Sequence, residues 1–198
     1  MFVRRRVSVA LLGVAAAIGL SIATQPMIDT GAAGPGGAGC QLSGTATISP
    51  GLTTTSQSFT YSFSGTLSGC QSSSSPAPTA GTVFAGIDPS GQRESSGFPA
   101  GTGSCGSSST SGIAVAQFND GSTAVISYTT SGAGPGVLLQ GTVGGTATFG
   151  TNTYTTSAQW SGDSATGTLT FQPASGQDCV TVPVTSAAIN GVTTLGSA

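Results

Sequence analysis

The chain contains no histidine and no lysine, and its four basic residues are all arginines. Three of them, Arg4, Arg5 and Arg6, stand near the N-terminus, which leaves Arg93 as the single cation of the remaining chain. Nucleic acids and anionic lipid headgroups are bound by clusters of basic side chains. The sequence therefore excludes both as natural partners.

The lack of histidine and lysine also bears on catalysis. A nucleophilic serine needs a neighbouring general base, and neither usual base is present. The segment "GDSATG" (162–167) has the Gly-Asp-Ser triplet of some serine hydrolases, but we predict that it is only a turn. The protein is predicted not to be an enzyme, with no catalytic, cofactor-binding or metal-binding residues.

Carboxylates are the catalytic groups that the chain does contain, and a pair of them could cleave glycosides. Most stand beside Gly, Pro or Ser, where aspartates are usually solvated turn residues. A calcium site in "DPSGQRE" (88–94) would lack the alternating oxygen ligands of a calcium loop. A carboxylate-based hydrolase is therefore only an alternative. Its candidate residues are Asp88, Glu94, Asp120, Asp163 and Asp178.

The N-terminal segment "MFVRRRVSVALLGVAAAIGLSIAT" joins three arginines to an apolar run from Val9 to Ala23. Ser21 and Ala23 supply small residues before a cleavage point after Ala23. This pattern predicts a secretory signal peptide over 1–23 and a secreted, extracellular protein. A membrane anchor is the alternative, because the run is only slightly shorter than a bilayer span. After cleavage one cation faces six acidic residues, a net charge of −5.

Residues 24–39 are rich in Gly and Pro without periodicity, so they predict a flexible lead-in to one domain over 40–198. Within that domain Phe59, Tyr61 and Phe63 alternate with Ser and Thr, the period of a half-buried strand. Further strand-like runs follow, and Asn119-Asp120-Gly121 is typical of a hairpin turn. The predicted fold is all-β: a single antiparallel domain of eight or nine short strands, either a barrel-like meander or an immunoglobulin-like sandwich.

Two finer predictions concern the second half of this domain. The segment "TYTTSAQW" (153–160) is predicted to pair with "ATGTLTF" (165–171) across residues 161–163. Residues 88–110 are predicted to form one long irregular loop. Because that loop holds Arg93 and Glu94, it is the favoured place for a binding contact.

Four cysteines in an exported chain predict two disulfides. A turn near Thr54 brings Cys40 close to Cys70, which leaves Cys105 to pair with Cys179. Cys70 is out of register with Phe59, Tyr61 and Phe63, so the first bridge needs a bulge near Gly65 or Gly69, or a bond on the outer face. A bridge from Cys40 to Cys179 is the alternative. Zinc ligation is excluded, because no two cysteines are closely spaced.

Several aromatic side chains are candidates for a platform that stacks on sugars or apolar ligands. They are Tyr128, Phe149, Tyr154 and Trp160. Core packing is the favoured interpretation, because Trp160 follows an alternating stretch.

The hairpin sequences "SGTATISPGL" (43–52) and "FTYSFSGTLSGC" (59–70) resemble small secreted actinobacterial all-β proteins of unassigned activity. This resemblance covers most of the chain after the signal and implies no functional motif. A looser likeness is to the enediyne apoproteins of the neocarzinostatin type, which are acidic, secreted, all-β carriers with two disulfides and an apolar cleft. That likeness implies a carrier role.

Three functions stay open at this point. The main prediction is an exported, non-enzymatic β-domain that acts in the cell envelope or medium through binding or structure. The first alternative is a small-molecule carrier whose apolar cavity is lined by Phe59, Tyr61 and Phe63, and the second is the carboxylate-based hydrolase. The predicted partner is a ligand of the envelope or medium, with no cofactor and no membrane span in the mature chain.

Overall fold

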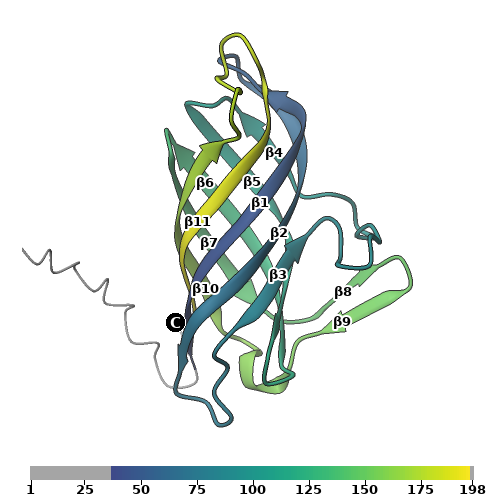
Figure 1. Cartoon of the computed structure of the whole chain (residues 1–198). Coiled ribbons are helices and arrows are strands. Elements are labelled where there is room, and N and C mark those ends of the chain that lie inside the picture. Colours follow the sequence, from purple (N-terminus) through teal and green to yellow (C-terminus); the bar gives the residue numbers. More distant parts are fainter. Residues whose placement is uncertain (1–36, 197–198) are drawn as a thin grey trace, which may run out of the picture.

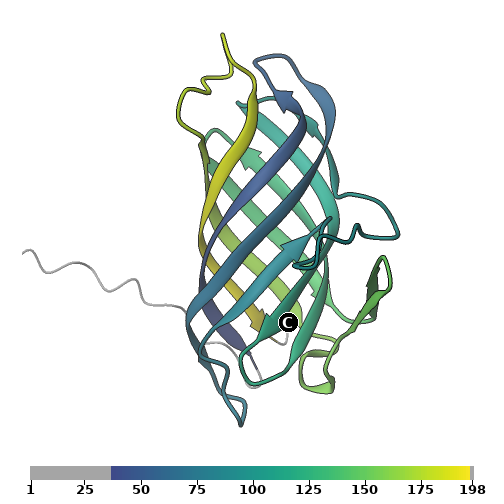
Figure 2. The same cartoon turned by 45° about the vertical axis from the view of Figure 1, so that its right-hand side comes forward.

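The computed structural model describes residues 37–196, which form a closed antiparallel β-barrel (Figures 1 and 2). The predicted signal peptide and most of the lead-in lie outside the described residues. The strands in chain order are β1 (Ala38–Leu52), β2 (Gln57–Ser72), β3 (Gly81–Ala85), β4 (Ala100–Gly103), β5 (Ser107–Phe118), β6 (Thr123–Ala133), β7 (Gly136–Val143), β8 (Thr146–Phe149), β9 (Asn152–Thr155), β10 (Ser164–Pro173) and β11 (Val184–Gly196).

Nine of these strands make one sheet in the order β1-β11-β10-β7-β6-β5-β3-β2-β4, and the pairing of β1 with β2 closes it. The short strands β3 and β4 share one position between β2 and β5, so the barrel has eight strand positions, which we call staves. Every neighbouring pair is antiparallel. The strands follow one another around the barrel in chain order, as in an up-and-down meander, except that β7 is followed by β10 because β8 and β9 form a separate hairpin. The predicted all-β single domain is confirmed, and of the two predicted architectures the chain adopts the barrel. Its first two strands, at 15 and 16 residues, are longer than predicted.

The first predicted disulfide, Cys40–Cys70, is confirmed, and so is its predicted bulge. Gln41 pairs with Ser68 and Gly39 with Gln71, so β2 carries one extra residue at this point. Gly69 has a φ of +56°, a backbone conformation that glycine adopts without strain. The extra residue turns Cys70 inward, where it bonds to the buried Cys40 across a Cα–Cα distance of 4.1 Å.

The predicted pairing of 153–160 with 165–171 is wrong. β9 pairs instead with β8, as a hairpin outside the barrel, while β10 lies between β7 and β11. The chain returns from this hairpin along β6, where the hydroxyls of Thr156 and Ser157 accept hydrogen bonds from backbone N–H groups of the strand. A single 3₁₀ turn over Ala158–Trp160 follows. These hydrogen bonds hold Trp160 at the lower end of the barrel.

Two predicted boundaries also need correction. The irregular loop predicted over 88–110 contains β4 and the start of β5, so the excursion from the barrel covers only residues 86–99. Its Gly and Ser residues form strand because β2 and β5 supply hydrogen-bond partners on both sides. The predicted lead-in ends too late, since Ala38 and Gly39 already belong to β1 and pair with both β2 and β11.

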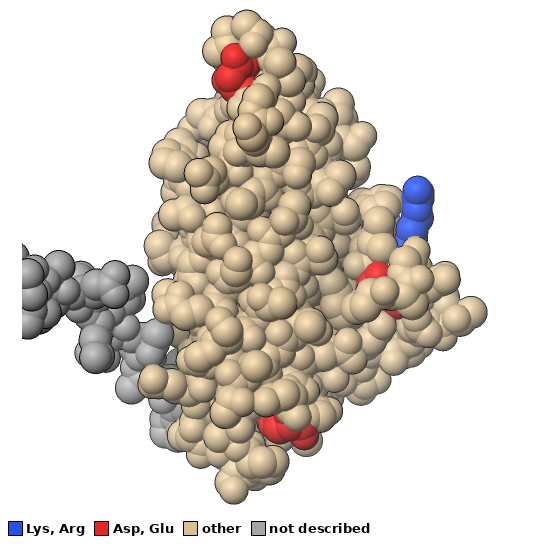
Figure 3. All heavy atoms as spheres, in the orientation of Figure 1, with Lys and Arg blue, Asp and Glu red and all other residues tan. Residues whose placement is uncertain are grey.

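The outer face of the barrel is rich in hydroxyl groups, because Ser and Thr alternate with the inward residues. The sequence of β2 shows this pattern, because Ser58, Thr60, Ser62 and Ser64 alternate with the inward aromatic residues. Figure 3 shows acidic side chains at separate places, away from the middle of this face, and one basic side chain on the loop beside the barrel. The face seen in this view therefore carries few charges.

Candidate binding cavity

The barrel encloses a cavity of about 170 Å³. Inward side chains from all eight staves line it, and most of them are aliphatic or aromatic. Phe59, Tyr61 and Phe63 are among the lining residues, as the carrier hypothesis predicted. The ring of Phe63 lies over Gly44 and Gly65, which face each other on β1 and β2 and leave room for it. The alternation read from the sequence of β2 therefore identifies one wall of the cavity correctly.

Four hydroxyl groups form a connected chain in this mainly apolar interior. The hydroxyl of Tyr61 lies 2.5 Å from that of Tyr128 and 3.1 Å from that of Thr110. Thr110 in turn lies 2.7 Å from the hydroxyl of Thr130. The four residues come from β2, β5 and β6, and all of them line the cavity. We call this group the hydroxyl chain.

Both tyrosines of the hydroxyl chain keep their protons. Burial raises the pKa of Tyr128 well above that of a free phenol, and the neighbouring Tyr61 raises it further. Burial also raises the pKa of Tyr61, although its hydrogen bonds with Thr110 and Tyr128 oppose this. Among residues 37–196, no Asp, Glu, Lys or Arg lines the cavity. The interior is therefore uncharged at every physiological pH.

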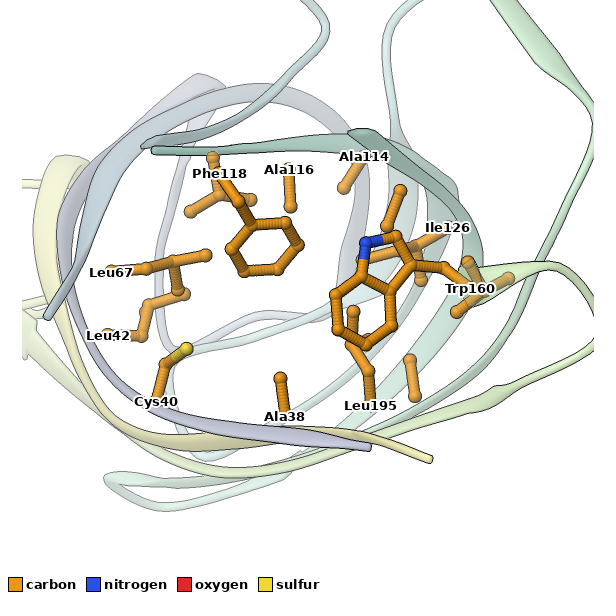
Figure 4. Close-up of a cluster of buried hydrophobic side chains, with 14 of the residues drawn as sticks. Ala38, Cys40, Leu42, Leu67, Ala114, Ala116, Phe118, Ile126, Trp160 and Leu195 are labelled. Carbon is orange, nitrogen blue, oxygen red and sulfur yellow. The ribbon is translucent and has the colours of Figure 1, made fainter. Parts of the chain in front are cut away.

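Aromatic residues close the lower end of the barrel. Trp160 is fully buried, and its ring packs against Phe118 with a centroid distance of 5.4 Å (Figure 4). The indole N–H donates a hydrogen bond to Ser122 Oγ at 2.9 Å. The preference for core packing of Trp160 is confirmed, but the residue lies on a 3₁₀ turn rather than on the predicted strand.

The second predicted disulfide, Cys105–Cys179, lies at the upper end of the barrel. Cys105 lies in the turn between β4 and β5, and Cys179 lies in the connection from β10 to β11. Both pack against a buried apolar cluster that includes Leu52, Phe59 and Val184. The bridge therefore ties the β10–β11 connection to the opposite rim.

The remaining aromatic candidates separate in space. Tyr128 points into the cavity, whereas Phe149 and Tyr154 of the β8–β9 hairpin pack on the outside of the barrel against Phe84. Sequence reasoning named Tyr128 but missed its partnership with Tyr61 and with the threonines Thr110 and Thr130. Thr110 and Thr130 are direct partners on β5 and β6, and the arrangement of the strands in the barrel brings Tyr61 of β2 to Thr110 and Tyr128.

The excursion over 86–99 packs against the β8–β9 hairpin rather than standing free. Glu94 is 7% exposed and forms an isolated bridge with Phe149, and its carboxylate accepts a hydrogen bond from Ser96. Burial raises the pKa of Glu94, and the bond from Ser96 opposes this effect. Arg93 is exposed and lies over the ring of Phe98, at 5.2 Å from its centroid. A binding contact in this loop stays a prediction, with Arg93 as its accessible residue.

Asp88 fixes the excursion to the hairpin. Its Oδ1 accepts hydrogen bonds from Ser90 and from the Gln92 backbone, and its Oδ2 accepts them from Asn152 and Tyr154 at 2.7 and 3.0 Å. Burial alone would raise the pKa of Asp88, but these hydrogen bonds outweigh it and hold the pKa far below its usual range. The prediction of solvated turn carboxylates is therefore wrong for Asp88 and Glu94, which are both buried.

The other carboxylates belong to turns. Asp120 accepts hydrogen bonds from Ser122. Asp178 accepts them from the Thr181 hydroxyl and from three backbone N–H groups, which lowers its pKa. Asp163 precedes β10, and burial raises its pKa. The "GDSATG" segment places Gly162 in a turn with φ of +91°, and the hydroxyl of Ser164 donates to the Gly196 carbonyl. Ser164 thus has a structural hydrogen bond at the start of β10.

Removing the Asp88 carboxylate should release the excursion. Because Arg93 is the single basic residue after Arg6, trypsin can cut residues 7–198 only in this loop. Losing the hydrogen bonds of a buried carboxylate costs about 2 kcal/mol. We therefore expect tryptic cleavage of Asp88→Ala to be roughly 30-fold faster than that of the wild type, as the open population rises.

Asp178→Ala, which removes a carboxylate from the far end of the barrel, is the control and should leave the cleavage rate unchanged. Because the pKa of Asp88 is lowered in the folded protein, its anchoring is complete above the ordinary value of 3.8 and weakens as the pH falls below it. Equal tryptic rates for wild type and Asp88→Ala would contradict this account.

Comparison with known proteins gives no relative from which a function could be transferred. No family model matches the chain, and no curated protein and no solved structure matches it either. In residues 37–196 no three His, Cys, Asp or Glu side chains gather as a metal site, and no helix there could cross a membrane. The two disulfides indicate an oxidising environment, in agreement with the predicted extracellular location.

Proposed function

We propose that the protein is an extracellular, non-enzymatic binding barrel that carries a small, neutral, apolar molecule in its interior. The cavity of about 170 Å³ carries this proposal. An engineered apolar cavity of about 150 Å³ stays dry and binds benzene, so a space of this size suits a single ring with short substituents.

The lining of the cavity supports a neutral ligand over a charged one. A charged group would lose its hydration inside the barrel, and no lining side chain carries an opposite charge to compensate. The same lining supports binding over hydrolysis, because no carboxylate faces the space where a ligand would lie. The carrier hypothesis therefore has more support than a purely structural role.

Toluene is a suitable probe, because it is apolar and has the size of a single ring. A ligand that binds only the folded protein raises the free energy of unfolding, so toluene should raise the melting temperature of the wild type. Ala114→Leu places three further carbons in the cavity, because Ala114 is a lining residue. We expect this variant to bind toluene at least about tenfold more weakly, since overpacking a filled site costs about 1–3 kcal/mol.

Ala188→Leu is the matched control. Ala188 lies on β11 opposite the exposed Thr45, so its side chain faces outward and the variant should bind toluene as the wild type does. Isothermal titration of the three proteins gives the comparison. A wild type that binds no toluene, or an Ala114→Leu variant that binds it equally well, would overturn the proposal.

A further inference from the structure

Polar groups are concentrated on one wall of the cavity. The hydroxyl chain occupies β2, β5 and β6, and Ser108 adds one more hydroxyl on β5. On the opposite wall, formed by β1, β7, β10 and β11, most lining residues are apolar. Its hydroxyl residues are Thr166, Thr193 and Thr194, and the hydroxyls of Thr166 and Thr194 bond to each other. A ligand in this cavity therefore meets mainly hydrocarbon on one side and the connected hydroxyl chain on the other.

The hydroxyl chain has one more hydrogen than it can use. Each of its four hydroxyls carries one hydrogen, and the chain contains three hydrogen bonds. Whichever way the bonds are directed, one O–H is left without an acceptor inside the chain. None of the other described residues forms a hydrogen bond with these four hydroxyls. The cavity wall thus presents one spare donor, on the buried Tyr128 or on one of the part-buried residues Tyr61, Thr110 and Thr130.

A spare donor in apolar surroundings favours a ligand with a matching acceptor. An unsatisfied buried polar group costs about 1–3 kcal/mol, and a ligand acceptor would recover that loss. Because the raised pKa values of Tyr61 and Tyr128 keep both phenols protonated, the wall donates at every physiological pH. The acceptor must be neutral, because a charged group would lose its hydration and the described lining residues offer no opposite charge.

From this geometry we infer that the natural ligand is an apolar molecule bearing one neutral hydrogen-bond acceptor, such as a carbonyl or ether oxygen, that docks on the hydroxyl chain. The inference rests on the proposed function and specifies its ligand class. It also fixes the orientation of the ligand, with the oxygen toward β2, β5 and β6 and the hydrocarbon toward β1, β7, β10 and β11.

The test compares cyclohexanone with methylenecyclohexane, which have the same shape and differ in one carbonyl oxygen. The measured quantity is the ratio of their dissociation constants in each protein, so that the different hydration of the two probes cancels between proteins. The variants remove either half of the hydroxyl chain: Tyr61→Phe with Tyr128→Phe, and Thr110→Val with Thr130→Val. Thr193→Val, which removes a hydroxyl from the opposite wall, is the control.

We expect at least one double variant to lose about three- to tenfold of the relative preference for the ketone, as for one net hydrogen bond. Thr193→Val should keep the ratio of the wild type. A shift of the cyclohexanone carbonyl stretch to lower infrared frequency on binding to the wild type tests the same contact without any substitution.

The two proposals fail in different ways. Unchanged ratios in both double variants, or an unshifted carbonyl stretch, would overturn the inference while binding of methylenecyclohexane still supported the carrier function. If neither probe bound to the wild type, the carrier function itself would be wrong.

Discussion

Replacing Trp160 with alanine is expected to lower the free energy of unfolding by about 3–5 kcal/mol, as for other buried Trp and Phe residues. Its ring is fully buried in the core cluster at the lower end of the barrel. The substitution removes the packing on Phe118 and the hydrogen bond to Ser122 Oγ. The barrel cannot collapse to fill the space, because its strands are fixed by their ladder hydrogen bonds. Urea unfolding gives the measurement.

Trp160→Phe separates the two contributions. It keeps an aromatic ring at the site and loses the hydrogen bond from the indole N–H, so the expected loss is smaller, about 1–2 kcal/mol. Trp160 is the single tryptophan of the chain, so intrinsic fluorescence reports on this site alone. A loss below about 1 kcal/mol for Trp160→Ala, or ready quenching of its fluorescence by iodide, would show that the ring is not buried.

The first hairpin could be predicted from the sequence because its signals are local. The alternation of Phe59, Tyr61 and Phe63 with hydroxyl residues fixes which face of β2 is buried. In a regular strand Cys70, at an even position, would face away from the odd-numbered Phe59, Tyr61 and Phe63. One extra residue in the strand turns it inward, and Gly69 can supply that residue at a positive φ. Composition and alternation likewise predict the all-β class.

The second half of the barrel is harder to predict, because parts of its strands have no alternation of apolar and polar residues. β4 reads "AGTG" and β5 begins "SSST", so neither sequence differs from a loop of the same composition. Their strand structure comes from neighbours far away in the chain. The β8–β9 hairpin and Trp160 were misassigned for a related reason, since Thr156 and Ser157 bond to β6 at a distance of about 30 residues in sequence.

The cavity could be predicted only in part. Alternation in β2 identifies three of its aromatic side chains, but a sandwich with the same strands would bury them in a filled core. Tyr61 and Tyr128 are 67 residues apart, and no local pattern connects them. The pairing of β1 with β2 and of β5 with β6, together with closure of the barrel, decides that their hydroxyls meet.

Removing the Cys105–Cys179 bridge is the second substitution with a large expected effect. The bridge closes a loop over 74 residues of sequence, and a cross-link of that length stabilises a folded protein by about 4 kcal/mol through the entropy of the unfolded chain. We expect Cys105→Ala with Cys179→Ala to lose about that amount in urea unfolding. The effect on the native state should be local, because Cys179 lies in the connection between β10 and β11.

Hydrogen exchange distinguishes this local effect from general loosening of the barrel. Backbone N–H groups of the β10–β11 connection, such as those of Asp178 and Cys179 that donate to the Val182 carbonyl, should exchange faster in the double variant. The N–H groups of β5 and β6 should change only by the global loss of stability.

The matched control is Cys40→Ala with Cys70→Ala. Its loop spans 30 residues, so the entropic loss is smaller. The two cysteines also already face each other across paired strands. If the Cys105–Cys179 variant lost less than about 1 kcal/mol, closure of the upper rim would have to come from the apolar cluster of Leu52, Phe59 and Val184 alone.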